Sequence, residues 1–316
     1  MPGEFAGESF STLARRLFHA TRPKFFPASV LPILAGTAWG VSAAAAFDAT
    51  SFALALGAVV LVHAGSNVLN DVGDDAGGTD RCNDSRIYPY TGGSQFIQAG
   101  IIDATGMLRL GIGLLVAAAA AGLLLLALKG PMILAFGITG VLLGVLYSLG
   151  PLRLSALGLG ELAVGFAFGT LPVAGAAWLQ GGVVDAGVLV YSLPVSAWVA
   201  AILLINEVPD IAADAATGKR TLPVRLGRRG TAVLYVLAHF VALAAVARLA
   251  VLGNLPAVAP LVPLALTWPA FRAAAAIRRG SDDPRGMRRA IESTLMIHAA
   301  GTTWLTGCVL AAYVLK

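Results

Sequence analysis

The sequence predicts an all-α protein that crosses a membrane many times. Of its 316 residues, 57% are hydrophobic and 12% are charged, and the mean hydropathy is +0.80, whereas soluble domains are about 45–50% apolar. The apolar residues gather in runs of about 20, the length that a helix needs to span a bilayer. Because no run alternates with a period of two, the sequence excludes a transmembrane β-barrel.

Nine apolar segments are long enough to span, and short polar loops separate them. Their ranges are 25–47, 52–70, 107–128, 131–149, 159–179, 186–206, 231–252, 257–277 and 291–315. We expect about nine transmembrane helices around a central cavity, within a single domain that covers residues 1–316. The first segment exceeds the roughly 7–15 apolar residues of a signal peptide, so we expect it to remain as a span.

The positive charges predict the orientation. With residues 1–24 in the cytoplasm, 19 of the 22 Lys and Arg residues fall on the cytoplasmic side, and only Lys129, Arg248 and Lys316 fall on the other. This asymmetry follows the positive-inside rule and accounts for the net charge of +5 without a nucleic-acid partner. We therefore expect an integral protein of the inner membrane whose cavity and polar loops face the cytoplasm.

Polar residues gather at the ends of two segments. Residues 66–80, at the end of the second segment, include two Asn and four Asp, and a similar cluster ends the sixth segment. The pair Asn70 and Asp74 precedes the pair Asn206 and Asp210 by 136 residues. This offset indicates two related four-helix halves and a ninth helix, which resembles the internal repeats of transporters.

Helical spacing predicts that each cluster forms a polar ladder along one face of a helix. The first ladder consists of His63, Asn67, Asn70 and Asp74. The second consists of Asn206, Asp210 and Asp214. Stacked carboxylates repel each other unless cations lie between them, and oxygen ligands favour Mg²⁺, which commonly binds one or two carboxylates together with substrate phosphates. The ladders therefore predict a site for a magnesium diphosphate.

Cations follow the second ladder within a dozen residues. Lys219 and Arg225 would meet the diphosphate oxygens that no metal holds. The alternative is that they serve only the positive-inside asymmetry, which is a sufficient account of Arg228 and Arg229.

Several motifs resemble those of the UbiA superfamily of intramembrane aromatic prenyltransferases. They are Arg22-Pro23-Lys24 with Pro27-Ala28-Ser29 and Pro32, Asn67-x-x-Asn70-Asp71-x-x-Asp74 with Gly78-x-Asp80, Tyr147-x-x-Gly150-Pro151, Gly158-Leu159-Gly160-Glu161, and Asn206-x-x-x-Asp210-x-x-x-Asp214 with Gly218-Lys219-Arg220-Thr221-Leu222. The chain is most similar to the dihydroxynaphthoate branch of menaquinone synthesis, because Gly78 replaces the last Asp of the ubiquinone-type motif and Asp80 follows two residues later. Residues 86–95 also resemble a lid segment of the family.

The resemblance implies a Mg²⁺-dependent transfer of a polyprenyl chain from an allylic diphosphate to an aromatic acid, here 1,4-dihydroxy-2-naphthoate. It implies that two Mg²⁺ ions are held by Asn70, Asp74, Asp210 and Asp214. The residues that it implies for catalysis are Asp71, Asp74, Asp210, Asp214 and Tyr147, whose ring would face the allylic cation. The residues that it implies for binding of the substrates are Arg22, Asn67, Asn70, Asn206, Glu161 and the two cations Lys219 and Arg225. Asp71 and Asp80 would serve either as second metal ligands or in deprotonation of the acceptor.

The sequence leaves two alternatives. The acceptor could be 4-hydroxybenzoate or another quinone or lipid precursor, although the Gly78 and Asp80 spacing argues against 4-hydroxybenzoate. The protein could also be a transporter, since carriers share repeated halves and intramembrane polar residues. A carrier needs access from both sides, whereas both ladders end on one face and the opposite loops are almost uncharged. The sequence therefore favours the enzyme.

Overall fold

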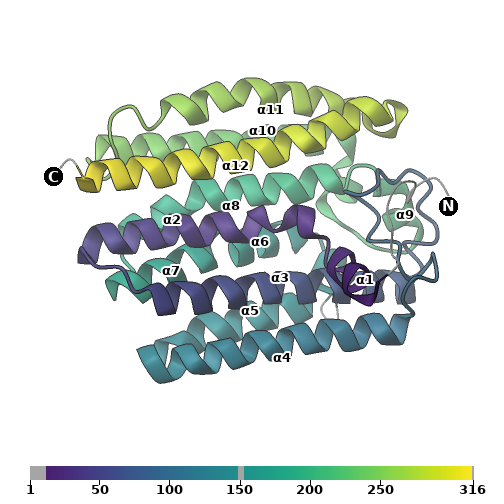
Figure 1. Ribbon diagram of the computed structural model, residues 1–316. Helices are drawn as coiled ribbons and strands as arrows, with labels where there is room; N and C mark the ends of the chain where they lie inside the picture. Colours follow the sequence, from purple (N-terminus) through teal and green to yellow (C-terminus); the bar gives the residue numbers. More distant parts are fainter. Residues whose placement is uncertain (1–11, 149–152, 315–316) are drawn as a thin grey trace.

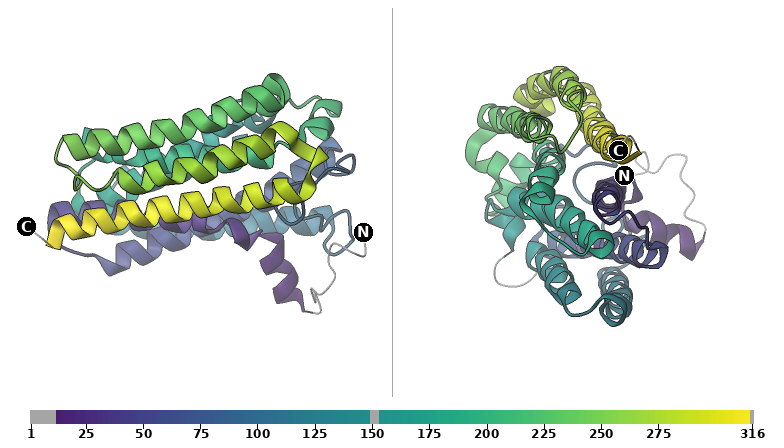
Figure 2. Two further views of the ribbon diagram at one scale, coloured as in Figure 1. Left: turned by 90° about the horizontal axis from the view of Figure 1, so that it is seen from above. Right: turned by 90° about the vertical axis from the view of Figure 1, so that its left-hand side faces the viewer.

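Helices form every regular element among residues 12–148 and 153–314, the part of the chain that the computed structural model describes. The long helices lie side by side in one bundle, seen along its length in Figure 1 and end-on in the right-hand view of Figure 2. They are α2 (Pro27–Ala44), α3 (Ala49–Gly77), α4 (Ala104–Lys129), α5 (Met132–Ser148), the continuous run of α6 (Gly160–Gly165), η3 (Phe166–Thr170) and α7 (Leu171–Gly181), α8 (Ala186–Asn206), α10 (Leu222–Val251), α11 (Leu261–Arg279) and α12 (Pro284–Val314). The prediction of an all-α fold is confirmed.

Shorter helices lie at one end of the bundle, the right-hand end in Figure 1. They are α1 (Leu13–Ala20), η1 (Pro23–Phe25), η2 (Leu154–Ala156), α9 (Ile211–Ala216) and η4 (Gly280–Asp282). The irregular loop 78–103 lies at the same end. Helix α12 ends at the opposite end of the bundle.

Every predicted apolar segment contains a helix, but the number of spans stays a prediction. Within the described ranges, seven helical segments are long and apolar enough to cross a membrane, and α5 is a shorter apolar helix. Helix α11 is not among the seven.

Three long helices extend well beyond the apolar segments that predicted them. Helix α3 continues to Gly77 rather than ending at residue 70, and α12 begins at Pro284 rather than at residue 291. Helix α10 begins at Leu222 rather than at residue 231, with a kink at Gly227. Hydropathy marks only the part of a helix that suits lipid, whereas the helix ends where its backbone hydrogen bonds end. For α3 that point is Gly78, whose φ of +78° suits a glycine C-cap. The polar residues of the first ladder therefore stay on a rigid helix.

Helices α2 and α7 approach each other closely through small residues. A Cβ atom on Gly36 would lie 2.2 Å from the carbonyl oxygen of Val173, and one on Gly40 would lie 2.4 Å from that of Ala177. Glycines four residues apart on one helix face are typical of membrane helices that pack with their backbones close together. This contact holds the first part of the chain against the second.

Helix α12 closes the bundle by packing against α2, α8 and α11. The buried ring of Trp198 in α8 fills the space left by Gly301, where a Cβ would lie 2.4 Å from the ring. The Tyr235 hydroxyl in α10 hydrogen-bonds with Thr294 of α12 over 2.7 Å. These contacts join α12 to α8 and α10 within the largest cluster of buried apolar residues.

Candidate active site

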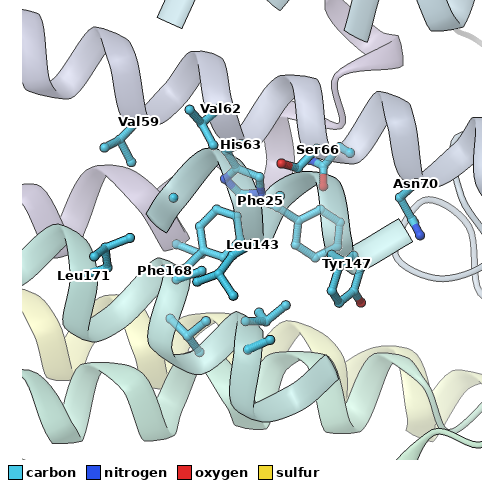
Figure 3. A pocket seen from close by; sticks show the side chains of 18 of the residues that line it. Phe25, Val59, Val62, His63, Ser66, Asn70, Leu143, Tyr147, Phe168 and Leu171 are labelled. Atoms are coloured by element: carbon cyan, nitrogen blue, oxygen red, sulfur yellow. The ribbon is translucent and has the colours of Figure 1, made fainter. Parts of the chain in front are cut away.

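A cavity of about 640 Å³ lies among α3, α4, α5, α7 and α8. Residues of α3 from Ala55 to Asp74 line this cavity. They extend over about 28 Å along the helix axis, at 1.5 Å per residue. Figure 3 shows Asn70 and Tyr147 towards one end, with Val59 and Leu171 towards the other. The polar end, which faces α9 and the loop 78–103, is lined by Asn70, Asp74, Thr79, Asp80, Asn83, Asn206, Glu207, Asp210, Asp214 and Lys219. The cavity therefore joins a polar head to a long apolar groove.

The first predicted ladder lies on one unbroken helix, α3. Asn70 donates from Nδ2 to Asp74 Oδ2 over 3.3 Å, and Asn67 donates to the Thr21 carbonyl over 3.0 Å. His63, deeper in the bundle, hydrogen-bonds through Nδ1 with the Ser29 hydroxyl over 2.6 Å and also lines the cavity. The ladder spacing is thus confirmed for this half of the site.

The second ladder does not lie on one helix face, so that prediction is wrong. Helix α8 ends at Asn206, and a turn precedes Asp210, which is the N-cap of α9. Pro209 accounts for the break, because proline has no backbone N–H for the helical hydrogen bond. Asp214 follows within α9. All three residues nevertheless line the cavity.

Lys219 joins the two clusters. Its ammonium hydrogen-bonds with Asp74 Oδ1 on α3 and lies 3.7 Å from Asp214 Oδ1 on α9. The Thr79 and Thr217 hydroxyls form a second link over 2.9 Å. The two polar clusters, 136 residues apart in sequence, therefore face one another across the mouth of the cavity.

The loop 78–103 binds carboxylates of both clusters. Asn83 donates from Nδ2 to Asp210 Oδ1 over 2.6 Å, and the Gly92 amide donates to Oδ2 of the same residue over 3.3 Å. The Ser94 amide donates to Asp71 Oδ2 over 3.0 Å. Helical periodicity could not find these contacts, because they come from an irregular segment. Asn83 is therefore a site residue that the sequence did not predict.

Tyr90 fastens this loop to its neighbours. Arg22, which lines the cavity, donates from Nη2 to the Tyr90 carbonyl over 2.9 Å. The Tyr90 hydroxyl donates to Glu292 of α12 over 3.1 Å. Lys24 and Arg288 each lie 5.8 Å from the centre of the Tyr90 ring. The predicted lid segment is thus held against the polar end of the cavity.

The site carries more negative than positive charge. Burial raises the pKa of Asp80 to about 9, and neighbouring carboxylates add to this effect. Burial likewise raises the pKa of Asp214 to about 7 against the opposing effect of Lys219, and it raises the pKa of Asp210. For Lys219, burial lowers the pKa, but the carboxylates of Asp74 and Asp214 outweigh it and leave the pKa raised. Additional cations would favour the ionised carboxylates.

The residues present fit magnesium bound together with a phosphate ligand. Among the buried oxygens with no hydrogen-bond partner in the described part of the chain are Asp71 Oδ1 and Asp80 Oδ2. Both point at the same glycine, since a Cβ on Gly93 would lie 2.9 and 2.8 Å from them. No three His, Cys, Asp or Glu groups within residues 12–148 and 153–314 converge to enclose a metal by themselves. Such an arrangement suits Mg²⁺, which takes one or two carboxylates and completes its shell with phosphate and water.

Other predicted residues take different places. Tyr147 and Asn206 line the cavity. Glu161 is buried and accepts from the Leu222 amide over 2.8 Å, at the start of α10. Arg225 lies outside the cavity wall, and its guanidinium donates to the carbonyls of Arg220 and Leu157 over 2.9 Å each. The Gly150-Pro151 part of the predicted motif lies outside the described residues.

Two further residues near the site were not predicted. Arg153 brings its guanidinium beside the end of α3, where a Cβ on Gly77 would lie 3.3 Å from Nη2; the sequence had counted it only towards orientation. Glu207 follows Asn206 and lines the cavity. The sequence did not predict it, because it lies one residue away from the i, i+4 spacing of Asn206, Asp210 and Asp214.

Comparison with known proteins identifies the family. The model of the UbiA prenyltransferase family matches residues 29–313. The 1,4-dihydroxy-2-naphthoate octaprenyltransferase of Mycobacterium tuberculosis is 34% identical over 218 residues, which cover 68% of this chain and 70% of that protein. The protein of the same name from Haemophilus influenzae is 33% identical over 218 residues, with 66% and 68% covered.

Solved structures share the fold. A UbiA homologue from Archaeoglobus fulgidus bound to DMAPP and Mg²⁺ has a TM-score of 0.70 at 16% identity and covers 94% of this chain and 99% of its own. The apo structure of a UbiA homologue from Aeropyrum pernix K1 has a TM-score of 0.66 at 19% identity, with 90% and 97% covered. These likenesses confirm the predicted polytopic membrane fold. The chain belongs to the UbiA prenyltransferase family, and it is a prenyltransferase.

Proposed function

We propose that the protein transfers a polyprenyl chain from an allylic diphosphate to 1,4-dihydroxy-2-naphthoate in a Mg²⁺-dependent reaction. The observation that carries this proposal is the shape of the cavity, whose polar head joins an apolar groove. A polyprenyl diphosphate has the same two parts. The names of the relatives support the naphthoate acceptor, and the magnesium-bound homologue supports the metal.

The residues of the chain would divide the work as follows. Asn70, Asp74, Asp210 and Asp214 would hold the metal ions, which stabilise the charge that develops on the leaving diphosphate. Lys219 would donate to diphosphate oxygens that no metal holds. The ring of Tyr147 and the neighbouring apolar groove would exclude water from the allylic cation. The acceptor ring would then attack the allylic carbon and lose its carboxylate as CO₂.

We also propose that the polar end faces the cytoplasm and that residues 1–316 form one domain in the inner membrane. Support comes from the 19 of 22 Lys and Arg residues that fall on this side. The loops, α1 and α9 lie at the same end of the bundle in Figure 1. Both substrates would then reach the polar head from the cytoplasmic side of the membrane.

The direct test is release of diphosphate by the purified protein in lipid nanodiscs. We expect release to require an allylic diphosphate, dihydroxynaphthoate and Mg²⁺ together, and to stop when EDTA removes the metal. Replacing the naphthoate with 4-hydroxybenzoate tests the alternative acceptor. If no aromatic acid supports release, while vesicles that contain the protein accumulate a solute, the transporter alternative replaces this proposal.

The apolar groove gives a separate prediction about donor length. Gly137 lines the cavity on α5, and a Cβ there would meet nothing within 4 Å. The change Gly137→Leu should block the groove and lower kcat/KM for a long polyprenyl donor by about tenfold or more. Each methylene group of the donor that can no longer be buried costs about 0.8 kcal/mol of binding free energy. Dimethylallyl diphosphate, which does not reach this point, should react at its normal rate.

The matched control is Gly113→Leu on α4, which has equally open space but does not line the cavity. Kinetics with a short and a long donor, measured for both variants, check the prediction. Equal loss with both donors in Gly137→Leu would contradict the placement of the prenyl tail.

A further inference from the structure

Glu207 is a buried carboxyl group for which the diphosphate site has no use. It is 8% exposed, lines the cavity, and its Oε2 has no hydrogen-bond partner among the described residues. The nearby cation Lys219 pairs with Asp74 and Asp214 instead. An unpaired buried acceptor of this kind is costly, so its presence beside the cavity points to a ligand.

Glu161 fixes the position of Glu207. Its Oε1 accepts from the Leu222 amide over 2.8 Å, and the Glu161 side chain is 2% exposed. Its carboxyl group hydrogen-bonds with that of Glu207, and burial together with this neighbour raises the pKa of Glu207 well above its ordinary range. Glu207 therefore presents an anchored acceptor oxygen to the cavity.

The surroundings of the pair indicate which ligand suits it. Asn206 Oδ1 is a second buried oxygen with no partner in the described part of the chain. The Tyr147 phenol lies close enough to Glu207 and Glu161 to interact with them electrostatically, and its ring borders the cavity. These groups offer acceptors and an aromatic face but no cation. A diphosphate would be repelled here, whereas a hydroxylated aromatic ring would satisfy the free acceptor and stack beside the tyrosine.

We propose that Glu207 accepts a hydrogen bond from a ring hydroxyl of the aromatic acceptor, with Glu161 as the positioning residue behind it. This inference rests on the proposed function and names the residue that binds its second substrate. Because Asn206 and Asp210 lie on either side of the same turn, the acceptor ring would lie next to the bond that breaks in the donor.

The test is equilibrium binding of dihydroxynaphthoate and of its two monomethyl ethers to the full-length protein in nanodiscs. The variants are Glu207→Met, which matches the side chain in length but cannot accept a hydrogen bond, and Glu207→Gln, which keeps an acceptor oxygen. Because the buried ring hydroxyl would be left without a partner, binding of the naphthoate should weaken by roughly 10- to 100-fold in Glu207→Met and by less in Glu207→Gln. One of the two ethers lacks the hydroxyl that donates to Glu207. This ether should bind the wild type as weakly as the naphthoate binds Glu207→Met, and its affinity should be the same for the wild type and for Glu207→Met.

Two readouts separate this role from a structural one. The KM for the donor and the Mg²⁺ requirement should stay unchanged in both variants, and the control Asp84→Asn, an exposed carboxylate of the loop 78–103, should bind the naphthoate as the wild type does. Equal loss of donor and acceptor affinity, or the same discrimination against both ethers in wild type and Glu207→Met, would overturn the inference.

The same measurements distinguish the inference from the proposed function. If the wild type transfers prenyl groups but Glu207→Met binds the naphthoate normally, the inference fails and the function stands. If the wild type binds the hydroxyaromatic acid through Glu207 but releases no diphosphate, the function fails and the binding site stands.

Discussion

Replacing Asp74 or Asp210 by Asn is expected to lower kcat by roughly 10²–10³-fold or more, because each side chain comes from a different cluster and each is proposed to hold a metal ion on the diphosphate. Neither change alters a helix: Asp74 lies near the end of α3, and Asp210 precedes α9. Diphosphate release at saturating donor, acceptor and Mg²⁺ measures the effect, and circular dichroism and the melting temperature report whether the fold is kept.

The neighbouring carboxylate Asp75 is the matched control. It lies on the same helix, but its Oδ1 contacts Arg81 over 3.0 Å and Gln98 over 3.3 Å, and it does not line the cavity. Asp75→Asn should keep kcat within about threefold of the wild type, since changes away from such sites shift free energies by about 0.5 kcal/mol. Near-normal turnover by Asp74→Asn or Asp210→Asn would contradict the two-cluster magnesium site.

Replacing Gly36 by Leu should have the largest effect on stability. A Cβ at this position would lie 2.2 Å from the Val173 carbonyl oxygen, so α2 and α7 could not keep their distance. We expect the free energy of unfolding to fall by about 3 kcal/mol or more, the upper range for overpacked cores. Unfolding in mixed micelles, followed by loss of tryptophan fluorescence, measures the change.

The control for this experiment is Gly57→Leu. Gly57 lies on α3, is exposed, and has open space where a Cβ would lie. Leucine also has a higher helix propensity than glycine, by nearly 1 kcal/mol, so this variant should be as stable as the wild type or more so. Equal destabilisation of both variants would show that the close contact of α2 with α7 is not the cause.

Helical periodicity predicted the arrangement of one half of the site. His63, Asn67, Asn70 and Asp74 share α3 because nothing between them interrupts its backbone hydrogen bonds. The same rule failed after Asn206, since it counts spacing and ignores the proline three residues later. Pro209, which has no backbone N–H, thus ended the helix and with it the helical spacing of the second cluster.

Contacts that come from loops could not be predicted in this way. The bonds of Asn83 and of the Gly92 amide to Asp210 depend on how residues 78–103 fold back over α3. Arg225 carried the expected charge but donates to backbone carbonyls outside the cavity. Residue type and proximity in sequence identify candidates, but only the path of the backbone decides which of them reach the cavity.

The two polar clusters lie where long helices end rather than where they begin. The carboxyl end of a helix carries a partial negative charge of roughly half a unit from its aligned peptide dipoles, and α3 and α8 both direct this end at the mouth of the cavity. Phosphate-binding loops do the opposite, because they present the positive amino end of a helix. The cavity also meets positive helix ends, because Asp210 and Thr221, the N-caps of α9 and α10, are in its lining. An anion in the polar head would therefore be repelled by the ends of α3 and α8 and attracted by the starts of α9 and α10.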